Sequence, residues 1–224
     1  LSLVGSEMCI RDRLLTIGSW HKMDNCEFYL LYSGGYDSTV LLYDFIDKLP
    51  NKLTVIHIVT QYNQEETKAA REIIELVKDK ILNYIELEMP VYKTEIEYIP
   101  YRNAQFILRA LSTLTIKAGC AIILLGLIRV EEPFPDCTQY WLKTMEKLVQ
   151  VENPHIGLEA PYINNTKDEI YTVGCKFKVP LRNTFSCNFP VDGAECGECG
   201  NCKWKAKHKY PNYFRVIEGG KNNV

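Results

Sequence analysis

Residues 31–40 read Leu-Tyr-Ser-Gly-Gly-Tyr-Asp-Ser-Thr-Val, and they place a glycine turn between two different patterns of apolar residues. Before the turn, the mostly apolar run at residues 27–32 predicts a buried strand. After it, apolar residues at helical spacing predict a helix from about residue 37 to residue 46. Gly34 and Gly35 tolerate left-handed backbone and place no Cβ between the backbone N–H groups and a ligand. The turn therefore predicts an anion site at the start of a helix.

The side chains on this turn favour phosphate as the anion. Ser33 and Ser38 add hydroxyl groups and Asp37 adds a carboxylate, and Asp37 or Ser38 is also expected to cap the helix. The alternative is an ordinary glycine turn between a strand and a capped helix. The chain contains neither the G-x-x-x-x-G-K-[ST] pattern nor G-x-G-x-x-G, which argues against a kinase-like loop and against a dinucleotide site.

Strand-like and helix-like patterns alternate along most of the chain. Further strands are predicted at residues 53–59, 84–89 and 121–126, and further helices at 64–80, from Pro100 to Gly119, at 140–149 and from residue 166 onward. Thr166 and Glu169 form a capping box at the start of the last helix. This alternation predicts an α/β fold with a parallel sheet covered on both faces. Ligands in such folds bind beyond the carboxyl ends of the strands, where the glycine turn lies.

Length and charge limit the organisation and the partners. The 224 residues are enough for one domain with an appendage, and a net charge of −2 gives no electrostatic reason to expect nucleic acid as a partner. The longest apolar run, residues 121–128, is too short to cross a bilayer. We divide the chain into an extension at 1–22 that is not expected to belong to the native fold, a nucleotide-binding domain at 23–180 and a cysteine-containing lobe at 181–224. The extension resembles a translated cloning scar; the alternative is a native arm that packs on a neighbour.

The nine cysteines predict a reducing compartment, the cytoplasm, because their number is odd and no signal peptide precedes them; this argues against a disulfide scaffold. Four of them cluster near the C-terminus, and they are Cys187, Cys196, Cys199 and Cys202. C-x-x-C spacing and intervening glycines favour one tetrahedral zinc ion with a structural role. An iron–sulfur cluster is the alternative, but residue 206, where the ferredoxin run needs a cysteine, is Ala.

Five short strings resemble one known family. The string at 33–38 resembles the pyrophosphate loop of the PP-loop ATP pyrophosphatases, which cleave ATP between its α and β phosphates. The strings at 99–103, 134–137, 166–170 and 184–187 are similar to V-P-G-R-N, Y-P-D-C, T-K-x-E-I and T-W-S-C of the 7-cyano-7-deazaguanine synthase family in that superfamily. The resemblance covers residues 27–207 and includes the four-cysteine cluster.

The resemblance implies an adenine-nucleotide alpha-hydrolase-like, Rossmann-type α/β sandwich with a small four-cysteine zinc lobe. It implies a ligase that adenylates the carboxylate of 7-carboxy-7-deazaguanine, forms an amide with ammonia, and uses a second ATP to produce the nitrile. The implied cofactors are ATP, Mg²⁺ and Zn²⁺. The implied assembly is a homodimer without a nucleic-acid or membrane partner.

The resemblance also assigns candidate site residues. The ATP-binding residues are expected to be Leu31, Tyr32, Ser33, Gly34, Gly35, Tyr36, Asp37, Ser38, Thr39 and Val40. Asp37, Ser38, Arg102 and Lys167 are expected to be catalytic, Arg102, Asn103 and Asp136 to bind the substrate, and the four clustered cysteines to bind the metal. The alternative for Lys167 is a solvated lysine in a first helical turn, and for Arg102 a surface ion pair. Cys137 is expected to be a packing residue.

Three departures from the family pattern bear on the substrate. The family has Y-G-Q-R-H where this chain has residues 62–66, so two potentially cationic residues are replaced by Glu65 and Glu66, which would repel phosphate or a carboxylate substrate if they faced the site. Tyr101 replaces a glycine, and residues 129–133 differ from the usual asparagine- and alanine-rich stretch. Two alternatives therefore stay open. One is another PP-loop enzyme, such as an amide-forming deazapurine ligase or a tRNA-modifying enzyme, and the other is a non-catalytic nucleotide-binding relative.

Overall fold

The structure is a computed structural model that describes residues 25–62, 64–90, 98–114, 116, 119–130 and 134–208. The predicted extension at 1–22 lies outside the described residues, as do residues 131–133 and the end of the predicted lobe at 209–224.

Strands and helices alternate through the first two thirds of the chain. In order, the strands, α-helices and 3₁₀-helices (η) are β1 (Cys26–Leu31), α2 (Tyr36–Lys48), β2 (Leu53–Val59), α3 (Gln64–Val77), η2 (Lys78–Lys80), β3 (Asn83–Glu88), α4 (Arg102–Leu111), β4 (Cys120–Leu125), α5 (Gln139–Glu152), β5 (Ile156–Glu159), α6 (Lys167–Lys176), η3 (Leu181–Asn183) and α7 (Gly200–Lys207). None of the helices in the described ranges combines the length and hydropathy that a membrane span requires.

The five strands form one parallel sheet in the order β3-β2-β1-β4-β5. This confirms the predicted parallel α/β fold. Strand β1 lies in the centre, with Leu30 in register with Val55 of β2 and Leu124 of β4. The strand order reverses at β1, and ligands bind such sheets at that reversal, beyond the carboxyl ends of the strands.

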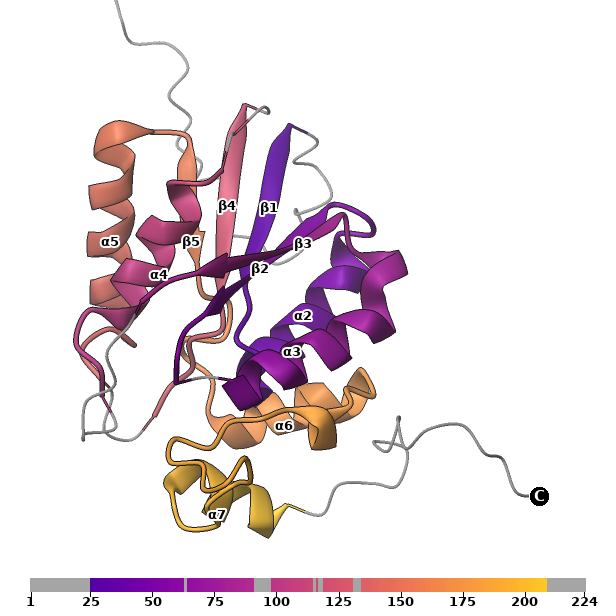
Figure 1. Ribbon diagram of the computed structural model, residues 1–224. Helices are drawn as coiled ribbons and strands as arrows, with labels where there is room; N and C mark the ends of the chain where they lie inside the picture. Colours follow the sequence, from indigo (N-terminus) through magenta and orange to yellow (C-terminus); the bar gives the residue numbers. More distant parts are fainter. Residues whose placement is uncertain are drawn as a thin grey trace, which may run out of the picture.

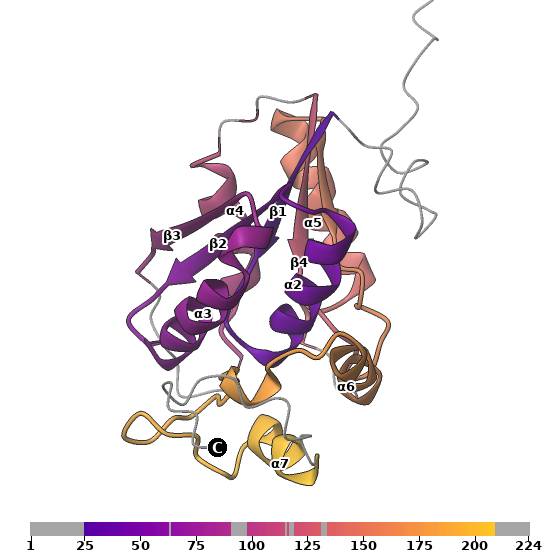
Figure 2. The ribbon, with the colours of Figure 1, turned by 90° about the vertical axis from the view of Figure 1, so that its right-hand side faces the viewer.

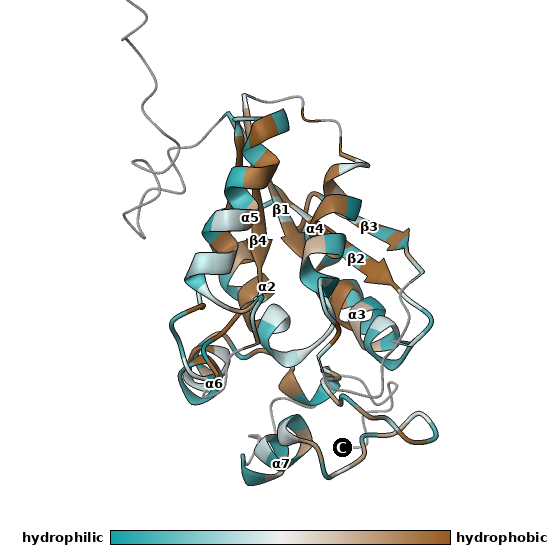
Figure 3. Ribbon diagram, turned by 90° about the vertical axis from the view of Figure 1, so that its left-hand side faces the viewer, coloured by the Kyte–Doolittle hydropathy of each residue, from teal (hydrophilic) through white to brown (hydrophobic). Residues whose placement is uncertain are grey.

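Helices cover both faces of the sheet, so β2 and β4 are buried almost throughout. Helices α2 and α3 pack on one face, against a core that includes Phe28 and Leu30. Helices α4 and α5 pack on the other face, against Tyr29 and Ile123 (Figure 1). Figure 3 shows the apolar strands between helices whose outer sides are polar. The alternation of neighbouring β1 side chains between the two cores follows from the two-residue period of a strand.

Two elements differ from the sequence prediction. Helix α4 ends at Leu111, not at Gly119, because the Ser112 and Thr113 hydroxyls donate to the carbonyls of Arg109 and Ala110, at 2.8 Å each. Strand β5 was not predicted from its four residues. It pairs with β4 and extends the sheet on that side.

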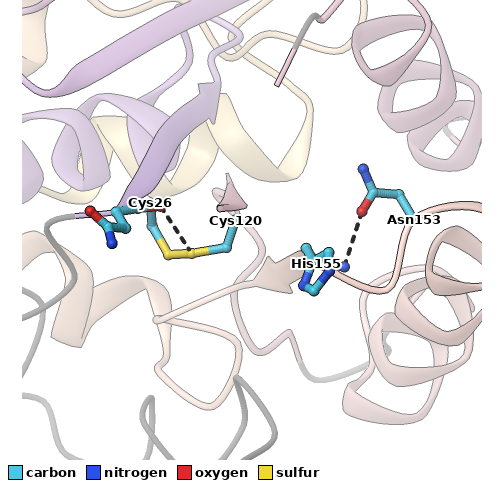
Figure 4. The surroundings of a disulfide bond; sticks show 5 residues. Cys26, Cys120, Asn153 and His155 are labelled. Carbon is cyan, nitrogen blue, oxygen red and sulfur yellow. Dashed lines mark hydrogen bonds between the residues drawn. A yellow bond between two sulfur atoms is a disulfide. The ribbon is translucent and has the colours of Figure 1, made fainter. Parts of the chain in front are cut away.

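A disulfide joins Cys26 and Cys120 at the starts of β1 and β4 (Figure 4). The expectation of reduced cysteines is wrong for this pair. The two residues are directly opposite in the parallel register, with their Cα atoms 4.6 Å apart, which is within the usual range for a disulfide. The bond lies at the amino ends of the strands, away from the glycine turn.

The part of the predicted lobe that the structure describes, residues 181–208, is called the cysteine lobe below. It contains η3, the four clustered cysteines and α7. In Figures 1 and 2 it lies at the lower end of the molecule, next to α6. Trp204 of α7 anchors it, since its indole N–H donates to Asp168 of α6 at 2.7 Å and its ring packs edge-on against Tyr36 of α2, with the ring centroids 4.8 Å apart.

Candidate active site

The glycine turn, called the glycine loop below, consists of residues 33–38 and connects β1 to α2. Gly34 has a φ of +86°, a left-handed conformation that favours glycine. A Cβ on Gly34 would lie 2.4 Å from the carbonyl oxygen of Glu66 and 2.8 Å from the backbone nitrogen of Ala70. The loop therefore touches the backbone of α3, and no other residue fits at this position.

Hydroxyl groups hold the loop in shape. The Ser33 and Ser38 hydroxyls are 2.9 Å apart, and the Gly35 N–H donates to the Ser33 hydroxyl at 3.1 Å. The N-cap of α2 is Gly35, so the prediction that Asp37 or Ser38 caps the helix is wrong. Both residues lie within the first turn, and the Ser38 hydroxyl donates to the Gly35 carbonyl at 3.2 Å.

A pocket of about 580 Å³ opens beyond the carboxyl ends of β1, β2 and β4. Its apolar wall includes Leu31, Ile56, Ile58, Phe106 and Leu125. Its polar wall includes Ser33, Asp37, Ser38, Glu66, Arg102, Asn103, Lys167, Asn188 and Asn201. The volume fits a small organic ligand, and the mixture of an apolar surface with a few polar groups is typical of ligand sites.

The ten predicted ATP-binding residues differ in their relation to this pocket. Those that line it are Leu31, Tyr32, Ser33, Asp37 and Ser38. Gly34, Gly35 and Tyr36 supply the backbone of the loop. Thr39 and Val40 are fully buried in α2 beneath the loop and do not line the pocket.

Lys167 faces Asp37 across the pocket, with its ammonium 3.9 Å from one carboxylate oxygen, Oδ2. Burial raises the pKa of Asp37, and the charge of Lys167 opposes that rise. The other oxygen, Oδ1, is buried without a hydrogen-bond partner among the described residues. An unsatisfied buried carboxylate oxygen beside a phosphate-type loop fits a Mg²⁺ ion, since carboxylate oxygens are ligands that this ion prefers.

Arg102 and Glu66 occupy the adjoining wall of the pocket. Burial raises the pKa of Glu66 to about 7, partly opposed by the Arg102 guanidinium. The Tyr62 hydroxyl hydrogen-bonds to Arg102, while the Arg102 Nε is buried without a partner among the described residues. The Glu66 carboxyl faces the pocket. This is the condition under which it was expected to repel phosphate or a carboxylate substrate.

Asn103 lines the pocket next to Arg102, but Asp136 does not. The Asp136 carboxyl is buried and accepts the backbone N–H of Asn103, in the first turn of α4. A carboxylate at a helix N-terminus stabilises that terminus, so this contact gives Asp136 the task of holding the start of α4, where Arg102 lies. Its direct contact with a substrate stays a prediction.

Cys137 also lines the pocket, and its thiol is protonated at neutral pH. Burial is the main cause that raises the pKa of Cys137 to about 12. A protonated thiol is a poor nucleophile, which agrees with the expected packing role.

The four clustered cysteines can hold one tetrahedral metal ion such as zinc. The sulfur atoms of Cys187, Cys196, Cys199 and Cys202 all lie within 4.8 Å of one another. Sulfurs at the usual zinc–sulfur distance are about 3.8 Å apart around a tetrahedral ion, so small side-chain movements suffice. The Cys196 sulfur accepts the backbone N–H groups of Cys199 at 3.3 Å and Glu198 at 3.4 Å, which lower the pKa of Cys196 to about 6. Such donors stabilise a thiolate, the form that binds metal.

The cysteine lobe reaches the glycine loop through residues that the sequence did not assign to the site. The Tyr36 N–H donates to the Ser186 hydroxyl at 2.8 Å, and the Phe185 N–H donates to the Gly34 carbonyl at 3.2 Å. Lys167 donates to the Asn201 side-chain oxygen. Ser186 directly precedes Cys187 and Asn201 directly precedes Cys202, and these positions are the signal that could have pointed to them.

Comparison with known proteins gives the same relationship as the five strings. The model of the family described as "Queuosine biosynthesis protein QueC" matches residues 85–210, more than half of the chain. The chain belongs to the QueC family. A 7-cyano-7-deazaguanine synthase of Leptospira interrogans is 29% identical over 209 residues, which cover 82% of this chain and 86% of that protein. Synthases of the same name from Campylobacter fetus and Rickettsia peacockii are 26% and 27% identical, covering 78% and 77% of this chain and 88% and 89% of their own lengths.

Proposed function

We propose that the protein is a carbon–nitrogen ligase that converts 7-carboxy-7-deazaguanine and ammonia into 7-cyano-7-deazaguanine at the expense of two ATP molecules. One observation carries the proposal. A single pocket contains the glycine loop and Lys167, which suit the phosphates of ATP, and also Arg102, a second cationic group that suits a carboxylate. The family and the names of the relatives supply the identity of the substrate.

The reaction has two stages. First, a substrate carboxylate oxygen attacks the α-phosphorus of ATP and pyrophosphate leaves; ammonia then attacks the acyl carbon, AMP leaves, and a proton is released with formation of the amide. Next, the amide oxygen attacks a second ATP and pyrophosphate leaves. Loss of AMP and of the two N–H protons then forms the carbon–nitrogen triple bond. Both stages need a carboxylate-derived oxygen held in line with an α-phosphorus, so positioning and charge stabilisation are the main tasks of the protein.

The residues divide these tasks. The Gly35 N–H, once the Ser33 hydroxyl that now accepts it has turned away, and the Lys167 ammonium bind the departing pyrophosphate, while the Tyr36 N–H stays bonded to Ser186. Asp37 Oδ1 would hold Mg²⁺, which neutralises phosphate charge when bound. Arg102 orients the substrate carboxylate, with its free Nε available as a donor.

We assign zinc to the four cysteines, with a structural role, because four thiolates leave no open position on the ion. We also propose a homodimer, which the resemblance implies, and the cytoplasm, which the odd number of cysteines favours. Sedimentation velocity of the purified protein tests the dimer, and localisation of a tagged chain in cells tests the compartment.

The decisive experiment combines the purified protein with ATP, Mg²⁺, ammonium and 7-carboxy-7-deazaguanine, and follows AMP by chromatography and the product by mass. We expect AMP and the nitrile. Asp37→Asn should reduce AMP formation at least 100-fold, because the unpartnered carboxylate oxygen is lost. The matched control Asp47→Asn, an exposed position on the same helix, should retain the activity. Absence of AMP with the wild-type protein, or normal AMP formation by Asp37→Asn, contradicts the proposal.

A second function, an amide-forming deazapurine ligase, is favoured by one observation. Glu66 places a carboxyl in the pocket at a position where the family pattern has a potentially cationic residue. The same assay separates the two functions, since this enzyme would accumulate the amide and consume one ATP per product.

A further inference from the structure

The metal-binding segment and the glycine loop share direct contacts, although some 150 residues separate them in the chain. The Ser186 hydroxyl, adjacent to the predicted ligand Cys187, accepts the N–H of Tyr36, the first residue of α2. The preceding Phe185 N–H donates to the Gly34 carbonyl. A Cβ on Gly35 would lie 3.2 Å from the Ser186 oxygen, so the fit between the two segments is close. Ser186 therefore packs directly behind the proposed phosphate site.

A second set of contacts starts from the other end of the metal-binding segment. Asn201, adjacent to the predicted ligand Cys202, accepts a hydrogen bond from the Lys167 ammonium. Its amide nitrogen donates to the Asn188 side-chain oxygen at 3.3 Å. Asn201 thus fixes the cation that faces Asp37 across the pocket.

The cysteine cluster holds Ser186 and Asn201 in these places relative to each other, together with a few polar contacts such as those of Lys205 with the Thr184 carbonyl and of Asn201 with Asn188. Between Cys187 and α7 the segment has no helix or strand, only one isolated bridge between Val191 and Ala194. Few of its residues are buried, and two of those few are Cys187 and Cys202 themselves. A segment with so little apolar burial depends on its metal ion for a fixed conformation. Loss of the ion would release both contacts to the pocket.

We propose that metal binding at the four cysteines is thermodynamically coupled to nucleotide binding at the glycine loop, and that Ser186 and Asn201 are the positioning residues that transmit the coupling. The inference rests on the proposed function only in that a nucleotide binds the loop. Coupling of this kind is reciprocal, because each ligand must raise the affinity of the other by the same factor. The metal site is then more than a stabiliser of the lobe, since its occupancy sets the affinity of the active site.

The test uses the full-length, zinc-loaded protein and α,β-methylene-ATP, which cannot be cleaved at the proposed position. Zinc affinity is measured at equilibrium against a competing chromophoric chelator, with and without the nucleotide, and nucleotide affinity is measured by titration calorimetry. We expect the nucleotide to raise zinc affinity about tenfold in the wild-type protein. In Ser186→Ala and Asn201→Ala, we expect nucleotide affinity to fall about fivefold, the effect of one lost hydrogen bond, and the gain in zinc affinity to shrink to about twofold or less.

Two variants separate positioning from a general loss of folding. Ser186→Thr keeps the hydroxyl and should retain the tenfold effect, while Ser112→Ala, which removes a hydroxyl outside the pocket, should behave as wild type. If the nucleotide binds but leaves the zinc affinity unchanged, the coupling is wrong and the proposed function stands. If no nucleotide binds, the coupling and the proposed function both fail. An unchanged or increased nucleotide affinity in Ser186→Ala would also overturn the assignment of that residue.

Discussion

Gly34 is the residue on which the shape of the glycine loop depends most directly. Its left-handed φ and the 2.4 Å approach of a hypothetical Cβ to the Glu66 carbonyl are two independent requirements for glycine. Left-handed backbone costs a residue with a Cβ about 1–2 kcal/mol, and forcing a methyl group against backbone costs about 1–3 kcal/mol more. We therefore predict that Gly34→Ala lowers the free energy of unfolding by roughly 2–5 kcal/mol, as measured by urea denaturation.

The control for this substitution is Gly119→Ala. A Cβ on Gly119 meets only the Asn25 carbonyl, at an ordinary contact distance of 3.8 Å. It should change the free energy of unfolding by less than about 1 kcal/mol. Equal effects of the two substitutions would show that the loop does not press against α3.

Tyr101 departs from the family pattern at a position where the backbone conformation favours glycine. The residue lies at the N-cap of α4 with a φ of +61°, which explains why the family has glycine there. The residue is 74% exposed and is not part of the pocket wall. The larger side chain therefore leaves the space beside Arg102 open.

Glu66 is the departure that lies in the wall of the pocket. With a pKa of about 7, its carboxyl is mostly neutral at pH 6 and mostly charged at pH 8. A charged Glu66 repels a carboxylate ligand in the same pocket, so affinity for 7-carboxy-7-deazaguanine should fall as the pH rises. We predict a loss of about fivefold between pH 6 and pH 8, the effect of a like charge about 4 Å away in a water-like dielectric.

Titration calorimetry at the two pH values measures this prediction. Glu66→Gln should bind the substrate with the same affinity at both, because the titrating group is gone. Asp47→Asn changes an exposed carboxyl that does not line the pocket, and should keep the wild-type pH dependence. A Glu66→Gln variant that retained the fivefold loss would assign the titration to another group.

At the scale of helices and strands, hydrophobic pattern predicted the elements that are long and strongly buried. Strands β2 and β4 are continuous β-branched and apolar runs, and they lie where their patterns indicated, to within a residue. Strand β5 was not predicted, because four residues are too few to show a hydrophobic period. Its strand conformation depends on pairing with β4. Helix α7 was not predicted for a related reason. Its polar sequence, residues 200–207, has little amphipathic pattern.

His57 connects three of these elements from within β2. Its Nδ1–H donates to the carbonyl of Tyr32 after β1, and its Nε2 accepts from the Thr67 hydroxyl of α3, each at 2.8 Å. Burial lowers the pKa of His57, with smaller opposing contributions from the Tyr32 carbonyl and Glu86. The neutral ring is therefore the form that the folded protein accommodates.

This predicts a specific loss of stability in mild acid. Because the folded pKa is depressed, the unfolded chain binds the extra proton first, so the contribution of His57 is complete above pH 6.5 and declines as the pH falls below it. Between pH 7.5 and 5.5, urea denaturation should show a drop in unfolding free energy of about 1 kcal/mol relative to His57→Gln. The comparison is made with this variant because Glu66 and Glu159, whose raised pKa values change stability in the opposite direction, are present in both proteins. His155→Gln, at an exposed position, should keep the wild-type drop.

At the scale of the whole molecule, the site combines segments that are far apart in the chain. The loop at 33–38, Arg102, Lys167 and Asn201 line one pocket. The glycine loop, the four cysteines and the parallel α/β class could be predicted because each has a local pattern, while the order of the strands was not predicted. That Ser186 and Asn201 would touch the loop could not, because it depends on how the cysteine lobe packs on α6, through side chains such as Trp204. The sequence also predicted reduced cysteines, and the register of β1 with β4 overrides that expectation for one pair.

The disulfide and the pocket lie at opposite ends of the sheet, so stability and ligand binding should respond separately to its removal. The bond links residues 94 positions apart and thereby restricts most of the unfolded α/β domain. We predict that the double variant Cys26→Ala and Cys120→Ala loses about 2–4 kcal/mol of unfolding free energy while its affinity for α,β-methylene-ATP stays within twofold of wild type. Urea denaturation with and without a phosphine reductant measures the first effect, and calorimetry measures the second.

Reductant should bring the wild-type curve to that of the variant, and Cys175→Ala, which removes a free thiol, should leave the reductant effect intact. If wild type and double variant unfold at the same urea concentration without reductant, the two thiols are not joined in solution, and the parallel register alone holds β1 beside β4.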